Sequence, residues 1–202
     1  MRDPYKGYRP PKSVIGFAVR YYYRYKISLR DLSEILQDRG LSLTYATIRN
    51  WCQSWGPVYA RSIRQKRGSA FKDKWHIDEV RVKMKGEVFW LWRLIDSEGE
   101  EIDVLLQRRR NAKSAIRFFK RALKKLGRLP HVMVTDKLRS YIKAHRVLLK
   151  SAKHLSHKRL NNKIENSHQP TREKERQMRG IKSVSSAQRF LSSMGALLNL
   201  LK

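Results

Sequence analysis

Apolar side chains recur at helical spacing three times within residues 1–55. The first stripe follows Ser13, which we expect to cap the first helix. The second opens on Ser28 and Asp31, the S-x-x-D pattern of a capping box, and ends at Gly40. Because only a tight glycine-containing turn separates the second helix from the third, residues 1–55 are predicted to form an all-α helix-turn-helix domain.

The exposed start of the third predicted helix is where a unit of this kind touches DNA. We expect polar side chains at this place to contact base edges or phosphates. The alternative is that they are ordinary solvated residues. The candidates are Tyr45, Thr47, Arg49 and Asn50.

The periodicity changes twice after this helix. Between residues 56 and 73 the apolar spacing fades and basic residues cluster, which predicts a basic linker. Short runs rich in Val, Ile, Leu, Trp and Phe then alternate with turn residues. They predict three strands in an antiparallel meander, at 75–84, 88–96 and 101–107.

A helix and a fourth strand follow the meander. Asn111 is expected to cap the helix and Gly127 to end it. The run 131–135 predicts a compact buried strand that ends on Asp136. Three strands, a helix, a fourth strand and further helices predict an α/β fold with a mixed sheet and flanking helices, in which sites gather at strand ends.

Composition adds a partner to this picture. The 202 residues include 46 Lys and Arg and 17 Asp and Glu, a formal charge of +29. A surplus of this size repels itself, so we expect a polyanionic partner, most commonly nucleic acid and less commonly acidic lipid. The single Cys52 cannot close an internal disulfide and no apolar run approaches the roughly 18 residues that span a bilayer, so we expect a reduced intracellular protein that does not enter membranes.

Two carboxylates are out of keeping with their surroundings. The stretch Val104 to Ile164 holds nineteen Lys and Arg and one acid, Asp136. Asp78 lies inside the first predicted strand, where a buried carboxylate needs a cation. Glu165 follows the basic stretch in a segment that could be helical.

Three other acids compete for the place of Asp78. Asp96 and Asp103 also lie in or near predicted strands, and the residue types alone favour neither Asp78 nor Asp96 over the other. Glu79 is a further rival, which strand alternation puts on the opposite face from Asp78. If three of these acids converge, their charges need cations. Oxygen ligands hold Mg²⁺ or Mn²⁺, and two such ions about 3.5 to 4 Å apart stabilise both oxygens of an in-line displacement at phosphorus.

Several ordered blocks resemble a known family, the bacterial insertion-sequence transposases with an Asp-Asp-Glu triad, and most closely the insertion-sequence-six family. The resemblance covers about Gly7 to Leu200. The blocks are Trp75-His76-Ile77-Asp78-Glu79, Trp92 to Asp96 followed by Gly99 and Asp103, Val134-Thr135-Asp136-Lys137, Leu160 to His168, and Gly180-Ile181-Lys182-Ser183.

The resemblance implies a ribonuclease-H-like catalytic domain over residues 74–202 and a DDE-type DNA transposase as the function. It implies that Asp78, Asp136 and Glu165 bind the metal ions. It further implies binding to the terminal inverted repeats of a mobile element, cleavage at the element's ends and strand transfer into target DNA. Lys137, Asn162 and His168 match positions around the acids and are expected to contact DNA.

The expected partners are double-stranded DNA, as element ends and as target, and further copies of this chain, since pairing two ends suits a homodimer or a larger assembly. The expected location is the bacterial cytoplasm, at the nucleoid. The alternatives are a non-catalytic helix-turn-helix protein, either an inactive transposase relic or a repressor, and a basic RNA-binding protein.

Overall fold

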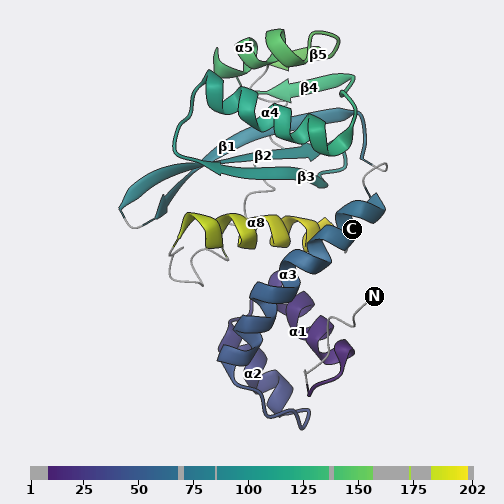
Figure 1. Ribbon diagram of the computed structural model, residues 1–202, viewed down its shortest axis with the longest axis vertical. Helices are drawn as coiled ribbons and strands as arrows, with labels where there is room; N and C mark the ends of the chain where they lie inside the picture. Colours follow the sequence, from purple (N-terminus) through teal and green to yellow (C-terminus); the bar gives the residue numbers. More distant parts are fainter. Residues whose placement is uncertain are drawn as a thin grey trace.

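The protein, seen in a computed structural model, places a group of helices at one end and an α/β layer at the other (Figure 1). Residues 9–67, 71–84, 86–136, 139–156, 173 and 183–199 are described. Three helices make up the first group: α1 (Lys12–Arg24), α2 (Leu29–Gln37) and α3 (Tyr45–Arg67).

The starts of the first three helices show how local sequence sets their ends. The predicted capping box of α2 is confirmed: Ser28 Oγ accepts the amide of Asp31, and the Asp31 carboxylate accepts the amide of Ser28. The predicted Ser13 cap is wrong. Helix α1 already begins at Lys12, after Pro11, whose fixed φ of −57° leads directly into the helix without a side-chain cap.

The predicted linker at 56–73 is wrong for most of its length, because α3 continues to Arg67. Gly56 and Pro57 look like a helix stop, but the apolar face goes on past them through Tyr59 and Ile63. At Gly56 the α1 helix approaches so closely that an added Cβ would lie 2.7 Å from the Tyr23 hydroxyl oxygen. Packing against α1 therefore keeps the chain helical where local sequence alone predicts a break.

The sheet holds five strands in the order β3-β2-β1-β4-β5. The first three pair antiparallel, whereas β4 runs parallel to β1 and β5 runs parallel to β4. This order and these directions are those of a ribonuclease-H-like domain, which confirms the predicted fold class. The strands are β1 (Lys74–Met84), β2 (Glu87–Asp96), β3 (Glu101–Gln107), β4 (Val132–Thr135) and β5 (Lys153–Ser156).

Helices cover both faces of the sheet. Helices α4 (Ala112–Leu126) and α5 (Arg139–Leu148) lie on one face, where Trp92 packs with Phe118 and Tyr141. Helix α8 (Val184–Asn199) lies on the other. Alternating strand residues divide between the two faces, as Leu91 and Trp92 do.

The predicted limits of α4 are confirmed. Asn111 accepts the amide of Ser114 at its start, and Gly127 ends it in the left-handed region at φ 68°. Strand β5 was not predicted. It has only four residues, and its pairing with β4 rather than any alternation in its own sequence makes it a strand.

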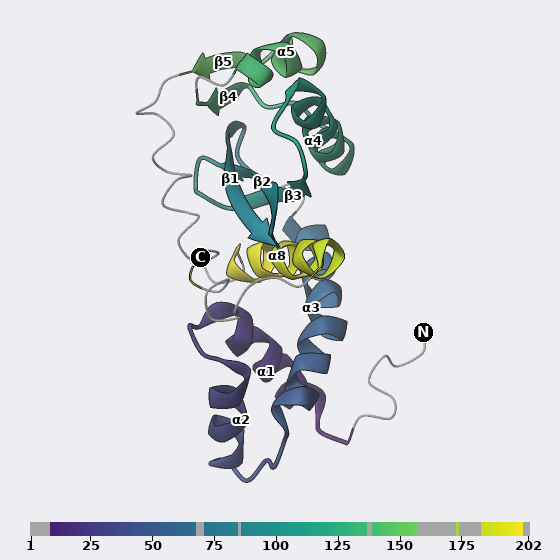
Figure 2. The ribbon, with the colours of Figure 1, turned by 90° about the vertical axis from the view of Figure 1, so that its left-hand side faces the viewer.

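Helix α8 connects the sheet to the helical end of the molecule (Figure 2). The Asn199 side chain exchanges two hydrogen bonds of 2.9 Å with the backbone of Glu101 in β3. Met194 and Leu197 of the same helix belong to the core formed by α1, α2 and α3. The helical end and the sheet are therefore joined through one helix that packs on both.

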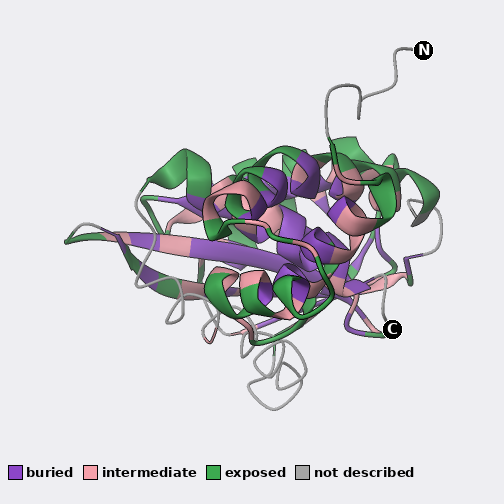
Figure 3. Cartoon of the chain, turned by 90° about the horizontal axis from the view of Figure 1, so that it is seen from below, coloured by how far each residue is buried: buried purple, intermediate pink, exposed green. Residues whose placement is uncertain are grey.

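Burial follows the layers. The sheet strands are largely buried, whereas the helices expose their outer turns (Figure 3). Within the described residues, no helix is long and apolar enough to cross a membrane.

Candidate active site at the junction of β1 and β4

The parallel pairing of β4 with β1 places Asp136 beside Asp78. Val134 of β4 pairs with His76 of β1. Two positions further along each strand direction, Asp136 therefore lies beside Asp78. One carboxylate oxygen from each, together with one from Glu79, all lie within 4.8 Å of one another. Two acids that are 58 positions apart in sequence are thus brought together by strand register.

Asp78 and Asp136 are both partly exposed. Asp78 Oδ1 accepts the amide of Glu79 at 2.8 Å. The backbone carbonyl of Asp136 accepts the hydroxyls of Thr135 at 2.7 Å and Ser156 at 3.1 Å, and these bonds fix the chain as it leaves β4. The two carboxylates therefore stand on a restrained backbone and remain accessible from solvent.

Glu79 differs from both because its side chain is fully buried. Tyr141 donates its hydroxyl to one carboxylate oxygen and Arg110 donates Nε to the other. Burial, opposed by these two donors and reinforced by the nearby charge of Asp136, raises the pKa of Glu79 from its ordinary value of 4.5 to about 7. Burial also raises the pKa of Tyr141, so its hydroxyl stays protonated and remains a donor.

Arg110 supplies positive charge to this group of acids. Its Nη2 lies 3.4 Å from Asp136 Oδ2, and its guanidinium lies 4.9 Å from the centre of the Trp90 ring. One guanidinium does not neutralise three clustered carboxylates when all are ionised. The site therefore has a residual negative charge that attracts a cation.

The arrangement suits a divalent cation with oxygen ligands. Asp78 and Asp136 each present a carboxylate oxygen at a separation that one ion can bridge, and both are reachable from solvent. Both oxygens of Glu79 accept hydrogen bonds from Tyr141 and Arg110, so Glu79 acts on the site through Arg110 and through its charge. The donor set therefore fits Mg²⁺ or Mn²⁺, and it fits no cation that prefers sulfur ligands.

The structure brings some predicted site residues together and leaves others untested. Asp78 and Asp136 meet, as the sequence predicts. Tyr45, Arg49 and Asn50 are exposed at the start of α3, and Thr47 is partly exposed there. The remaining predicted site residues lie outside the described residues: Lys137, Asn162, Glu165 and His168.

The rival Asp96 has a structural place instead. It is almost completely buried, and it accepts the amides of Lys72, Glu98 and Glu100. The bonds from Glu98 and Glu100 close the turn between β2 and β3, and the bond from Lys72 holds the segment before β1. Asp96 is therefore occupied with backbone donors, away from the junction of β1 and β4.

Sequence reasoning named Glu79 only as a rival to Asp78, and it missed Arg110 and Tyr141. Strand alternation correctly separates Glu79 from Asp78, yet the carboxylate of Glu79 still lies within 4.8 Å of the others. Arg110 stands in a run of three arginines, and nothing in that run distinguishes it from its neighbours. Tyr141 lies in a helix that was not delimited in advance. The only available signal was the adjacency of Glu79 to Asp78.

A ribonuclease-H-like sheet with paired carboxylates where β1 and β4 meet is the arrangement expected of the DDE polynucleotidyl transferases. The family model described as a DDE domain, of the IS240 transposase type, matches residues 72–202. Two transposases of Staphylococcus aureus are each 35% identical to this chain over 191 residues, in a match that covers 92% of this chain and 84% of the relative. One is the transposase for insertion sequence-like element IS431mec in strain Mu50, and the other is the transposase for insertion sequence element IS257 in transposon Tn4003.

Among solved structures, the catalytic domain of the Mos1 mariner transposase is similar with a TM-score of 0.45 and 16% identity, covering 74% of this chain and 87% of that one. The match to the DDE domain and the identity to the staphylococcal enzymes together show the family. The chain belongs to the insertion-sequence-six family of DDE transposases.

Proposed function

We propose that this transposase binds the terminal inverted repeats of its own insertion sequence, cleaves the DNA at the element's ends and joins the freed ends to target DNA. The observation that carries the proposal is the meeting of Asp78 and Asp136, one oxygen of each within 4.8 Å, at the junction of β1 and β4. The rest of the proposal assigns roles to residues around that pair.

We assign the metal to Mg²⁺ or Mn²⁺, with Asp78, Asp136 and Glu165 as its ligands. When bound, a divalent ion polarises the scissile phosphate and stabilises the charge that develops on the attacking and leaving oxygens. Asp78 and Asp136 orient it from adjacent strands. Glu79 and Arg110 set the charge around them, because Arg110 holds Asp136 at 3.4 Å from its Nη2 and is itself held by the buried Glu79.

Two regions are assigned to DNA. The exposed start of α3, with Tyr45, Thr47, Arg49 and Asn50, contacts the inverted repeat. Near the acids, Lys137, Asn162 and His168 contact the DNA that is cut. The net charge of +29 supports a duplex as the partner, since phosphate contacts supply most of the affinity in such complexes.

Transposition itself implies an assembly and a place of action. Joining two ends of one element requires two active sites, so we propose a homodimer or a larger assembly. We place the protein in the bacterial cytoplasm, bound to the nucleoid. As domains, residues 1–55 would recognise the DNA and residues 74–202 would perform the chemistry, with the helical stretch between them belonging to α3 for most of its length.

The test is cleavage of a labelled duplex that carries the element's end, with Mn²⁺ present. Wild-type protein should nick the fragment and transfer it, and Asp136→Asn should retard the fragment without nicking it, because the substitution removes one oxygen ligand and no part of the exposed start of α3. Glu98→Gln is the matched control, since it removes an exposed carboxylate in the turn between β2 and β3, which is not part of the group formed by Asp78, Glu79 and Asp136.

Two outcomes would reject the proposal in different ways. Unchanged strand transfer by Asp136→Asn would reject the active site. Retardation without nicking by the wild-type protein would favour the non-catalytic alternative, a repressor that occupies the inverted repeats.

A further inference from the structure

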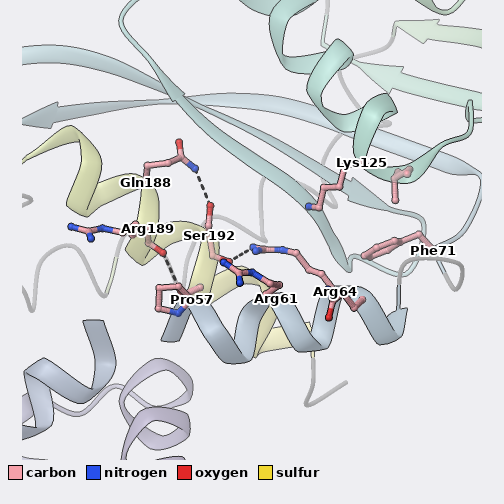
Figure 4. A pocket seen from close by; sticks show the side chains of 11 residues that line it. Pro57, Arg61, Arg64, Phe71, Lys125, Gln188, Arg189 and Ser192 are labelled. Carbon is pink, nitrogen blue, oxygen red and sulfur yellow. Dashed lines mark hydrogen bonds between the residues drawn. The ribbon is translucent and has the colours of Figure 1, made fainter. Parts of the chain in front are cut away.

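A second concave site lies away from the paired aspartates, where α3, α8 and the end of α4 meet (Figure 4). It is a cavity of about 540 Å³, which we call the junction pocket. Arg61 and Arg64 line it from α3, Arg189 from α8 and Lys125 from α4. None of its described lining residues is acidic. The pocket thus gathers four cations from three helices that are distant in sequence.

Two of the four cations are held in place by the fold. Arg64 donates Nη2 to the backbone carbonyl of Ser192, across the pocket in α8. Lys125 donates Nζ to the carbonyl of Ile102 and lies 3.2 Å from Asp103 Oδ1. These contacts hold both cations in fixed positions before any ligand arrives, which reduces the entropy that binding would cost.

The positive charge is not balanced locally. Asp103 lies beside Lys125 but is shared with Arg121, whose Nε lies 3.0 Å from its Oδ2. Burial lowers the pKa of both Arg64 and Lys125, because the charged form of each side chain has lost contact with water. A bound anion would offset that loss.

The other two cations extend from different helices (Figure 4). Arg61 and Arg189 are exposed on α3 and α8, and neither forms an ion pair with any residue in the described part of the chain. A guanidinium presents several donors in a plane and suits phosphate oxygens. Arg61 and Arg189 are therefore the two groups of the pocket that are available to an incoming phosphate.

We propose that the junction pocket binds the sugar–phosphate backbone of the DNA end, in the stretch between the part held by the start of α3 and the part cut at Asp78 and Asp136. The inference rests on the proposed function and adds to it a particular contact site. The four cations would take phosphate oxygens, and the partly exposed apolar surfaces of Pro57 and Leu126 would pack against deoxyribose.

The position of the pocket supports a backbone rather than a separate small anion. Its lining comes largely from α3 and α8, which lie between the helical end and the sheet (Figure 1), so a duplex that follows this side of the molecule from one end to the other would pass it. Its volume of about 540 Å³ exceeds the roughly 30 Å³ that one water occupies in the liquid by more than tenfold. One phosphate, which is only a few times larger than a water, would leave most of the pocket empty. A pocket of this size fits a segment of chain with several anionic and apolar groups.

The experiment measures DNA affinity without divalent ions, so it does not depend on catalysis. The variant is Arg61→Ala with Arg189→Ala, and the control is Arg117→Ala with Lys120→Ala, which removes the same charge from the exposed face of α4. Binding of a labelled element end is followed by fluorescence anisotropy over a range of salt concentrations.

Loss of two phosphate contacts should lower the slope of log Kd against log salt by about 1.8, since each contact contributes about 0.9. At about 0.15 M salt we expect Kd to rise about tenfold or more for the pocket variant. A shorter duplex that covers only the site of the α3 start should show no such change. Equal slopes for the pocket variant and wild type on the long duplex would overturn the proposal, as would an equal loss in the control variant.

Two further readouts complete the test. Titration with inorganic phosphate alone distinguishes the source of the anion: tight phosphate binding that the variant abolishes, with DNA slopes unchanged, would make the pocket a small-anion site and overturn the backbone assignment. Hydroxyl-radical footprinting gives a result that does not depend on the variant. Wild-type protein should protect the DNA backbone between the part held by the start of α3 and the part cut at Asp78 and Asp136. An unprotected gap in that stretch would also overturn the backbone assignment. If the wild-type protein fails to cut DNA yet the slope still falls, the proposed function fails and the pocket stands.

Discussion

Arg110 donates a hydrogen bond to Asp136, with 3.4 Å between Nη2 and Oδ2, from the loop that leads into α4. The same guanidinium donates Nε to the buried Glu79. Arg110 therefore links a buried carboxylate to one of the two partly exposed carboxylates of the site. A divalent ion bound at Asp136 would compete with Arg110 for the same oxygen, so the ion pair sets how readily the site accepts a cation.

Arg110→Ala should destabilise the protein at pH 8 and do so less at pH 6. At pH 8 the substitution leaves the ionised, buried Glu79 without its cation, which we expect to cost about 2 kcal/mol of unfolding free energy. At pH 6 Glu79 is mostly protonated, so the same substitution should lower the unfolding free energy by less. Urea unfolding at both pH values measures the difference.

The double variant Arg110→Ala with Glu79→Gln is the control for this prediction. The double variant should lose less stability than the sum of the two single losses, because without the Glu79 charge the protein no longer needs the Arg110 cation to balance it. Equal losses from Arg110→Ala at both pH values would show that the loss does not come from the ionised Glu79.

Glu79 should make the stability of the protein fall as pH rises from about 4.5 to 7. Its pKa is about 7 in the folded state against an ordinary value of 4.5, so between these values the folded state binds more protons than the unfolded state. The effect is complete near pH 7 and amounts to on the order of 3 kcal/mol, at 1.36 kcal/mol per pKa unit. Glu79→Gln should flatten this part of the pH profile in urea unfolding without divalent ions, and an unchanged profile would contradict the assignment.

Gly195→Ala should destabilise the packing of α8 on the sheet. A Cβ at this position would lie 1.7 Å from Glu101 Oε1, and that carboxylate cannot move away easily because it is buried and paired with Arg93 at 2.9 Å. We expect a loss of about 2 kcal/mol in thermal or urea unfolding. Gly16→Ala is the matched control: its Cβ would meet only the Tyr59 hydroxyl at 3.5 Å, and alanine favours the helix, so stability should stay level or rise.

Asp96→Asn and Asp78→Asn should separate structure from chemistry. Asp96→Asn turns an amide group toward the Lys72 or Glu98 amide and should cost about 1 to 3 kcal/mol of stability, while folded protein keeps its cleavage rate. Asp78→Asn should leave stability nearly unchanged and reduce cleavage at least about a hundredfold, because metal stabilisation of the transition state amounts to several kcal/mol. Full cleavage by Asp78→Asn would restore Asp96 as a candidate.

The sequence predicts the elements well wherever local pattern and tertiary packing agree. The meander, α4 with its Asn111 and Gly127 ends, and the capping box at Ser28 and Asp31 all appear as predicted. Local pattern fails at Gly56 and Pro57, where contact with Tyr23 outweighs the break that the two residues favour. It fails again at β5, whose four residues become a strand through pairing with β4.

The candidate site divides along the same line. Sequence by itself singled out Asp136, because a lone carboxylate in a basic stretch is visible without coordinates, but it left Asp78 and Asp96 as equal candidates for the second acid, since both lie inside predicted strands. Only the tertiary structure decided which groups surround the two aspartates of the site, since Glu79, Arg110 and Tyr141 come from three elements and meet through the packing of α4 and α5 on the sheet. Periodicity reports what each segment buries, and the meeting of distant side chains depends on strand register and helix packing that no single segment encodes.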